Sequence, residues 1–537
     1  MFRAGVVAVV CALAGATPAM AADSTCQLDA GPPPPSPRVI VAEFEGVPYD
    51  VLLPADYSAT TRRYPVLYLF HGRQYSEHSW LVKSDLQQFT AGFTGDRAAI
   101  VVTPTAGSDA YFYDYYDNSQ DWEKYIVGRL IPHIDATLRT IPDGAHRAIA
   151  GFSAGGLGAS YLGSRHPDLF AAVGAFSGVV DQGVPEAPYA GPGDVPVKSD
   201  AGSPGPARGP LPTTYHPPKS SCGGGSSTGD PVDQRWNWHE HSPPSLAENL
   251  RGDGVYTGAG NGQPCGPDDA NDPVLLAPGE PALLTMAQTF DRALTDAKVA
   301  HVFDPRPCGL HNMVNATRQM HPFWDLMAKS FGRPDPASFD FRSTDADIDV
   351  WGWSFRADPK RAPEFLEVQG ASASGVTLIG SGTTTVVTKR LFGPHERVDV
   401  SGAKPQSDTA DADGRLTMAV DLGPPAATPQ FGTDARAFTA RRIRFTVPGA
   451  AAQLPPDRTC SGRRLAVKLR HLTHGEARRS VAISVDGHRV LVRRGLRAQR
   501  LGRVDVTLPP GATRVGVRIR TTRNRTLKST RVYPACP

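Results

Sequence analysis

The first half of the chain contains short, unbroken apolar segments of the kind that are buried on both faces of a parallel sheet. They lie at residues 64–70, 98–103, 148–150, 171–176, 255–257 and 301–304, after two strand-like runs within 39–53 that break at Gly46. Segments with apolar residues at helical spacing separate them, at 121–138, 243–251, 281–297 and 323–331. Strands that alternate with helices predict an α/β domain with a mostly parallel sheet, which we place at residues 39–332.

The pattern changes beyond a Gly/Pro-rich linker at 332–337, where the helical period disappears. Apolar and polar residues alternate at 348–355, 481–485, 504–508 and 515–519, as expected of half-buried strands. Asp486-Gly487 is a signal for a two-residue hairpin turn. These patterns predict two β-sandwich-like domains after the α/β domain, at residues 338–450 and 455–537.

Two other segments are set apart by composition. Residues 185–230 are rich in Pro, Gly and Ser and predict a long insertion in the α/β domain. Residues 1–21 join one positive charge to a short apolar run and end in Ala19-Met-Ala21, which predicts a secretory signal peptide, followed by an extended lead-in at 22–38. No later apolar stretch is long enough to cross a bilayer, so we expect a secreted or cell-wall associated protein without a transmembrane segment.

Cysteine usage agrees with export. Of the seven cysteines, Cys11 lies in the predicted signal peptide, which leaves six for disulfides. Cys460 and Cys536 bracket the last domain, and we predict that they pair; the other pairings stay open. No C-x-x-C spacing is present, so no metal site is predicted.

The net charge of +3 conceals a strong asymmetry. From Arg441 to the end there are 23 Lys and Arg residues against four Asp and Glu. A basic surface of this kind favours anionic polymers, and we expect an anionic cell-wall polymer as partner and no nucleic acid. The alternative is a solvated β-domain with a high arginine content and no such partner.

The most informative motif is Gly151-Phe-Ser153-Ala-Gly155, which lies between a predicted strand and a helix expected to begin near Gly156. G-x-S-x-G in this context is the nucleophile elbow of α/β-hydrolases. The serine occupies a strained turn in which a side chain at Gly151 or Gly155 would collide with neighbouring backbone. We therefore predict an α/β-hydrolase with Ser153 as nucleophile.

A serine needs a base and an acid that orients the base. His311 follows the last predicted strand of the sheet and is the first candidate for the base; His321 is its competitor. For the acid, position alone does not choose among Asp268, Asp269, Asp272 and Glu280, all downstream of the strand at 255–257. Backbone N–H groups of Ala154 and Arg73 are the expected oxyanion donors.

The order of several motifs resembles a known family. The motifs are Tyr64–Gly72, the aromatic run at 111–116 before Asp121-Trp122, and Ala150–Gly156 with Ser177-Gly178 after it. Over residues 39–330 the chain is similar to the putative-esterase family, which includes esterase D, feruloyl esterases and mycobacterial mycolyltransferases. Residues 236–252 and 260–262 resemble the mycolyltransferase branch in particular.

The resemblance implies a set of site residues and no cofactor. Ser153 would be the nucleophile and His311 the base, with oxyanion donors at Arg73 and Ala154. Glu280 would be the acid, because that branch places a glutamate about ten residues before a helical phenylalanine, here Phe290. The chain departs from the branch after Asn312, where an insertion is expected and where His321-Pro-Phe-Trp324 stands in place of the branch's tryptophans.

Together these patterns predict a secreted serine esterase or acyltransferase. It would act on ester bonds, of cell-wall lipid or glycan, by a Ser-His-Glu triad through an acyl-enzyme. The alternative is a non-catalytic wall-binding or adhesive protein that uses the hydrolase fold as a scaffold.

Overall fold

The computed structural model describes residues 31–107, 111–116, 118–181, 235–267, 269, 279–405, 407–430, 438–455, 464–472 and 475–533. The predicted signal peptide, the insertion at 185–230 and the predicted Cys460–Cys536 pair lie outside the described residues. No described helix is both long and apolar enough to cross a bilayer.

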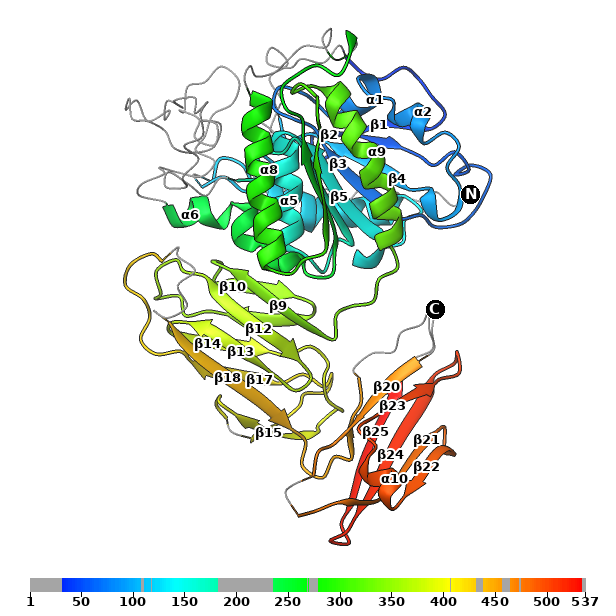
Figure 1. Ribbon diagram of the computed structural model, residues 1–537, viewed down its shortest axis with the longest axis vertical. Helices are drawn as coiled ribbons and strands as arrows, with labels where there is room; N and C mark the ends of the chain where they lie inside the picture. The colour runs from blue at the N-terminus through cyan, green and yellow to red at the C-terminus, as the bar shows by residue number, and fades with distance from the viewer. Residues whose placement is uncertain are drawn as a thin grey trace, which may run out of the picture.

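The first part of the chain forms one eight-stranded sheet in the order β1-β2-β4-β3-β5-β6-β7-β8 (Figure 1). Its strands are β1 (Val39–Phe44), β2 (Val47–Leu52), β3 (Val66–Phe70), β4 (Ile100–Pro104), β5 (Arg147–Phe152), β6 (Ala172–Phe176), β7 (Gly254–Ala259) and β8 (His301–Pro305). β1 and β2 pair antiparallel, as do β2 and β4, whereas the pairs from β4 to β8 are parallel. The predicted mostly parallel sheet is confirmed.

Helices cover both faces of this sheet. They are α1 (Ser79–Val82), α2 (Leu86–Phe89), α3 (Trp122–Tyr125), the π-helical η3 (Ile126–Leu130), α4 (Ile131–Thr137), α5 (Ala154–Arg165), α6 (Arg235–Glu240), the 3₁₀ segment η5 (Pro243–Leu250), α8 (Gly279–Asp296) and α9 (Met313–Ser330). The alternating side chains of β3 separate two cores. Tyr68 packs on the face covered by α3–α4, α5 and α8, and Leu67 packs on the face covered by α1, α2 and α9.

Two helix boundaries differ from the sequence prediction. α5 begins at Ala154, directly after the serine, and not near Gly156. The helix predicted at residues 323–331 is α9, which begins earlier and runs from Met313 through Pro322 to Ser330, so that it includes the segment after Asn312. Proline removes one helical N–H donor. The Arg306 side chain donates to the carbonyl of Arg318, four residues before Pro322, at 3.5 Å.

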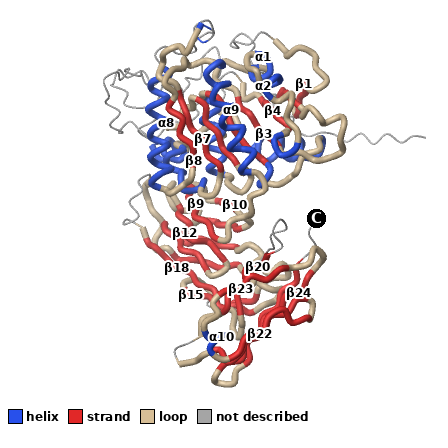
Figure 2. Tube along the Cα trace, turned by 45° about the vertical axis from the view of Figure 1, so that its right-hand side comes forward, coloured by secondary structure: helices blue, strands red, loops and turns tan. Residues whose placement is uncertain are grey.

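Beyond α9 the regular secondary structure of the described chain is almost entirely strand (Figure 2). The first group of strands comprises β9 (Ser338–Ser343), β10 (Asp347–Val350), β11 (Trp353–Arg356), β12 (Leu366–Ser372), β13 (Gly375–Gly380), β14 (Thr383–Val387), β15 (Arg397–Ser401), β16 (Ser407–Thr409), β17 (Thr417–Asp421) and β18 (Thr439–Thr446). They form a four-stranded and a six-stranded antiparallel sheet around one core. The first predicted β-sandwich-like fold is confirmed.

The last strands form a second, smaller pair of antiparallel sheets with its own core. They are β19 (Ala452–Gln453), β20 (Arg464–Leu469), β21 (Arg478–Val485), β22 (His488–Arg494), β23 (Arg503–Thr507), β24 (Thr513–Thr521) and β25 (Thr526–Tyr533), with the short helix α10 (Leu496–Gln499). Asp486 and Gly487 both have positive φ, 48° and 82°, in the predicted hairpin turn between β21 and β22. β19 lies before residue 455, so the pairing begins earlier than predicted.

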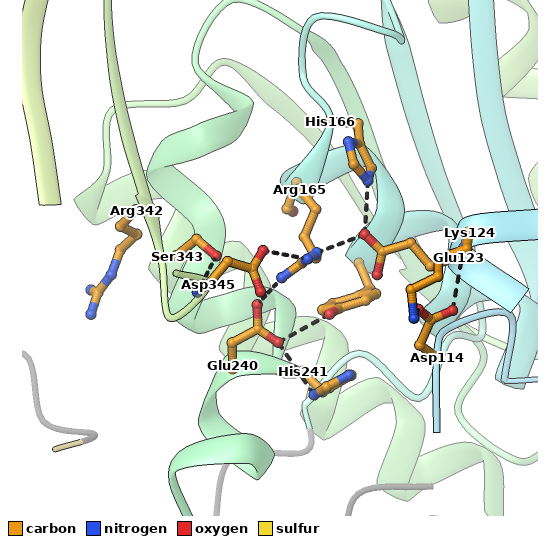
Figure 3. A network of polar contacts seen from close by, with 12 residues as sticks. Asp114, Glu123, Lys124, Arg165, His166, Glu240, His241, Arg342, Ser343 and Asp345 are labelled. Carbon is orange, nitrogen blue, oxygen red and sulfur yellow. Dashed lines mark hydrogen bonds and ion pairs between the residues drawn. The ribbon is translucent and has the colours of Figure 1, made fainter. Parts of the chain in front are cut away.

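A largely buried arginine, Arg165, joins the α/β domain to the first β-sandwich (Figure 3). Arg165, at the end of α5, contacts Glu123 at 2.9 Å, Asp345 at 2.5 Å and Glu240. Burial alone would raise the pKa of Glu123, but the Arg165 guanidinium and the hydrogen bond to His166 outweigh it and hold that pKa well below its usual value of 4.5. Glu123 therefore stabilises the fold above about pH 4.5, and this contribution is lost as the pH falls through the lowered pKa.

Removing the Arg165 charge should destabilise the protein strongly. Arg165→Met leaves buried carboxylates without a counter-charge, so we expect the free energy of unfolding at pH 7 to fall by roughly 3–5 kcal/mol. The loss should shrink below pH 4.5, because Glu123 then contributes less to the stability of the wild-type protein. Urea unfolding at pH 7 and pH 4, followed by tryptophan fluorescence, measures both effects.

The matched control is Arg97→Met, which breaks the exposed pair with Asp325. Exposed pairs contribute at most about 1 kcal/mol. Equal stability losses in the two variants would contradict the role assigned to the Arg165 cluster.

Candidate active site

Ser153 lies in the turn between β5 and α5, in a conformation that few serines adopt. Its φ is 57° and its ψ is −119°, and its N–H donates to the Phe176 carbonyl on β6 at 3.0 Å. A Cβ on Gly151 would lie 2.3 Å from the Gly155 carbonyl oxygen, and a Cβ on Gly155 would lie 2.3 Å from that of His71. The collisions predicted for the two elbow glycines are therefore present. The close packing of strand against helix holds the serine in its strained turn.

Three side chains form a continuous hydrogen-bonded chain. The Ser153 Oγ lies 2.9 Å from His311 Nε2, and His311 Nδ1 lies 2.8 Å from Glu280 Oε2. Ser153 is 4% exposed, His311 1% and Glu280 2%. With its proton on Nδ1, the ring donates to the carboxylate and accepts from the hydroxyl. This is the arrangement in which an imidazole can remove the serine proton.

Three hydrogen-bond donors surround the second carboxylate oxygen of Glu280. Oε1 accepts from the Ser177 hydroxyl at 2.6 Å, the Gly260 N–H at 2.5 Å and the Asn315 amide at 2.8 Å. Gln319 in turn donates to the Ser177 hydroxyl at 2.8 Å. Glu280 also lies in the first turn of α8, where the helix dipole favours a negative charge. These contacts fix the position of the carboxylate beside the imidazole.

The loop that carries His311 is tied to the neighbouring strand connection. A disulfide joins Cys265, after β7, to Cys308, after β8. Beside it, Gly309 donates to the Gln263 carbonyl at 2.6 Å. On the other side of the histidine, Asn312 caps α9 by accepting from the Asn315 N–H at 3.0 Å. The imidazole is thus held between a cross-linked loop and a capped helix.

The alternative site residues lie elsewhere or outside the described residues. His321 lies on α9, 3.0 Å from Asp85, with its ring stacked on Phe89 at 4.0 Å, and the structure does not bring it to Ser153. Asp269 accepts from the Cys265 N–H at 2.8 Å. Asp268 and Asp272 lie outside the described residues.

The expected oxyanion donors flank the serine. Ala154 is the first residue of α5, so its N–H belongs to the helix N-terminus. Arg73 follows Gly72 in the loop after β3, and a Cβ on Gly72 would lie 3.2 Å from the Ser153 Cβ. This loop therefore passes directly beside the serine.

Sequence reasoning missed the donors behind the acid. The sequence indicated Ser177 only as part of a family motif, without a role, and it gave no prediction for Asn315 and Gln319. The available signal was a pair of amides four residues apart, placed just after His311 and both fully buried on α9. No cluster of three or more His, Cys, Asp or Glu residues that could hold a metal ion occurs in the part of the chain that the structure describes.

Comparison with known proteins finds related sequences. Residues 46–313 match the family described as Putative esterase. Esterase Rv1288 of Mycobacterium tuberculosis is 35% identical over 136 residues, which are 24% of this chain and 28% of that protein. An endo-1,4-beta-xylanase/feruloyl esterase of Xylanibacter ruminicola is 31% identical over 138 residues, which are 24% of this chain and 19% of that protein. The match thus spans less than a third of either curated relative.

Among solved structures, a ferulic acid esterase is 22% identical, covering 55% of this chain and 98% of its own, with a TM-score of 0.38. The family match encloses β2 to β8 and all three members of the hydrogen-bonded chain, Ser153, Glu280 and His311. Through residues 46–313, this chain belongs to the putative-esterase family.

Proposed function

We propose that the protein is a serine esterase or acyltransferase that works through an acyl-enzyme. The Ser153 Oγ attacks the carbonyl carbon of an ester while His311 Nε2 takes the serine proton. The protonated imidazole then gives this proton to the leaving alcohol as the ester C–O bond breaks. Water, or a sugar hydroxyl, attacks the acyl-serine by the same route in reverse and regenerates the free serine.

The observation that carries the proposal is the Ser153–His311–Glu280 chain of hydrogen bonds at 2.9 and 2.8 Å. Glu280 fixes the ring and compensates the positive charge that forms on it. The N–H groups of Ala154 and Arg73 are proposed to bind the developing oxyanion, a contribution of roughly 10²–10³ in rate for each donor.

The substrate class and the location belong to the same proposal. Two relatives are named esterase and feruloyl esterase, and we propose an ester of a cell-wall lipid or glycan as substrate. The sequence of residues 1–21 and the Cys265–Cys308 disulfide favour an exported protein. We further propose an anionic cell-wall polymer as partner of the basic region after Arg441.

Covalent labelling tests the proposed nucleophile without knowledge of the substrate. A fluorophosphonate probe should react with the folded protein, because the activated Ser153 Oγ displaces fluoride from phosphorus. Peptide mass mapping should place the adduct on Ser153. Heat-denatured protein and Ser153→Ala should stay unlabelled.

Absence of labelling in folded protein, or an adduct on another serine, would contradict the proposal. That result would favour the non-catalytic wall-binding alternative.

A further inference from the structure

The four-stranded sheet of the last β-sandwich, in the order β22-β21-β24-β25, has a basic outer face. Along β24, Val515, Val517 and Ile519 are buried in the core. The alternate residues Arg514, Arg518 and Arg520 are exposed, so their side chains leave from the opposite face. The solvent-facing side of this sheet therefore carries a row of guanidinium groups.

Strand register adds cations to this row. Arg518 pairs with Lys528 on β25, and both side chains are exposed. On the other side, Ser480 of β21 pairs with both Arg520 and Arg494. We call Arg494, Arg514, Arg518, Arg520 and Lys528 the basic face.

A shallow furrow runs along the middle of the basic face. The outward positions of β21 hold the small residues Ser480, Ala482 and Ser484, which are half-buried between their neighbours. Because strands lie about 4.8 Å apart, Arg494 on one side of this furrow and Arg520 on the other are roughly 10 Å from each other. Gly516 extends the low floor, since a Cβ there would lie 2.8 Å from the Ser484 hydroxyl.

The described carboxylates of this sandwich are engaged elsewhere. Glu476 pairs with Arg525, and Asp505 pairs with Arg503 at 3.2 Å. Asp486, in the β21–β22 turn, accepts from the Arg514 backbone N–H at 2.7 Å. Within the described residues, none of them forms an ion pair with a side chain of the basic face. Like charges directly opposite, as in Arg518 and Lys528, destabilise a sheet unless an anion lies between them.

We propose that the basic face binds a linear anionic cell-wall polymer, with the chain lying along the β21 furrow and its carboxylate or phosphate groups between Arg494 on one side and the cations of β24 on the other. This inference deepens the partner proposed above and rests on the proposed export, but it does not depend on ester hydrolysis. Guanidinium groups suit such anions because they can donate two parallel hydrogen bonds.

Two other polyanionic partners fit less well. A membrane surface is bound by basic segments that also expose large apolar side chains such as Trp, Phe and Leu. In the described part of this sandwich, the exposed large apolar side chains are three valines, Val490 and Val492 on β22 and Val532 on β25, and one leucine, Leu496 on α10. None of them is aromatic, and they do not form the broad Trp-, Phe- and Leu-rich face of a membrane-binding segment. Nucleic acid does not suit an exported, disulfide-linked chain.

Binding to polygalacturonate and to poly(glycerol phosphate), measured on Ser153→Ala full-length protein, tests the proposal independently of catalysis. The triple variant Arg518→Gln/Arg520→Gln/Lys528→Gln should lose at least tenfold in affinity for one of these polymers at low salt. Wild-type affinity should fall as NaCl is raised, because salt screens exposed charges. The polymer whose binding weakens in the triple variant shows whether the bound anionic group is a carboxylate or a phosphate.

The matched control removes the same charge from the other outer face of the sandwich. Arg464→Gln/Lys468→Gln/Arg503→Gln alters exposed residues of the paired strands β20 and β23 and should change affinity less than threefold. Equal losses in the two triple variants would overturn the proposal in favour of a net-charge effect. So would tighter binding to duplex DNA or to phosphatidylglycerol vesicles than to both polymers. Unchanged thermal unfolding of each variant shows that it is folded.

Discussion

Ser153→Ala is expected to lower kcat/KM for p-nitrophenyl acetate by about 10⁴–10⁶-fold, to near the background rate. The reason is structural: among the described residues, Ser153 supplies the hydroxyl that lies 2.9 Å from His311 Nε2. Binding of the ester does not need the hydroxyl, so the KM of any residual activity should stay similar to that of the wild-type protein. Release of p-nitrophenol, followed for esters of increasing acyl length, measures the loss and also the preferred acyl group.

Ser160→Ala is the matched control, because Ser160 is a fully buried serine in α5, the helix that follows Ser153. Its activity should stay within a few-fold of wild type. If Ser153→Ala kept the activity of Ser160→Ala, the proposed mechanism would be wrong.

Glu280→Gln should have the second largest effect, a fall in kcat of roughly 10³–10⁴-fold with a folded protein. Glutamine keeps the size of the side chain but not its charge. An amide NH₂ facing His311 Nδ1 would favour the tautomer whose Nε2 carries the proton and cannot accept one from Ser153. The kcat for p-nitrophenyl acetate, with thermal unfolding as a check on the fold, measures this effect.

Asp269→Asn gives the comparison, because Asp269 is equally buried and was a candidate acid. Its side chain contacts the Cys265 N–H and Arg318, so kcat should fall by less than tenfold. A greater loss in Asp269→Asn than in Glu280→Gln would reverse the assignment of the acid.

The central strands and the elbow were predictable because their signals are local. Residues 148–150 and 171–176 are apolar without interruption, and a strand buried on both faces needs nothing more. The elbow glycines are dictated by contacts with backbone a few residues away, such as that between Gly151 and Gly155. His311 followed from chain order, since the last parallel strand, β8, ends just before it.

The rest of the site depends on which strands become neighbours. Cys265 and Cys308 can pair because β7 and β8 lie side by side, which the spacing of six cysteines does not reveal. Glu280 was separated from the aspartates only by the family resemblance, because all four residues follow β7. Asn315 and Gln319 could not be predicted because the helix was expected to begin at residue 323. Without a helix at 313–322, there was no reason to place these two amides on one buried face.

The contacts between the α/β domain and the first β-sandwich bear on how the chain can be dissected. Asn249 of η5 exchanges two hydrogen bonds with the main chain of Arg342 in β9, at 2.9 and 2.8 Å, much as a neighbouring strand would. Asp345, a few residues later, completes the surroundings of Arg165. A fragment cut at the linker would therefore leave the Asn249 side chain without these two hydrogen bonds and remove Asp345 from Arg165. The α/β domain therefore depends on residues beyond its own eight-stranded sheet, and a minimal active fragment has to include β9.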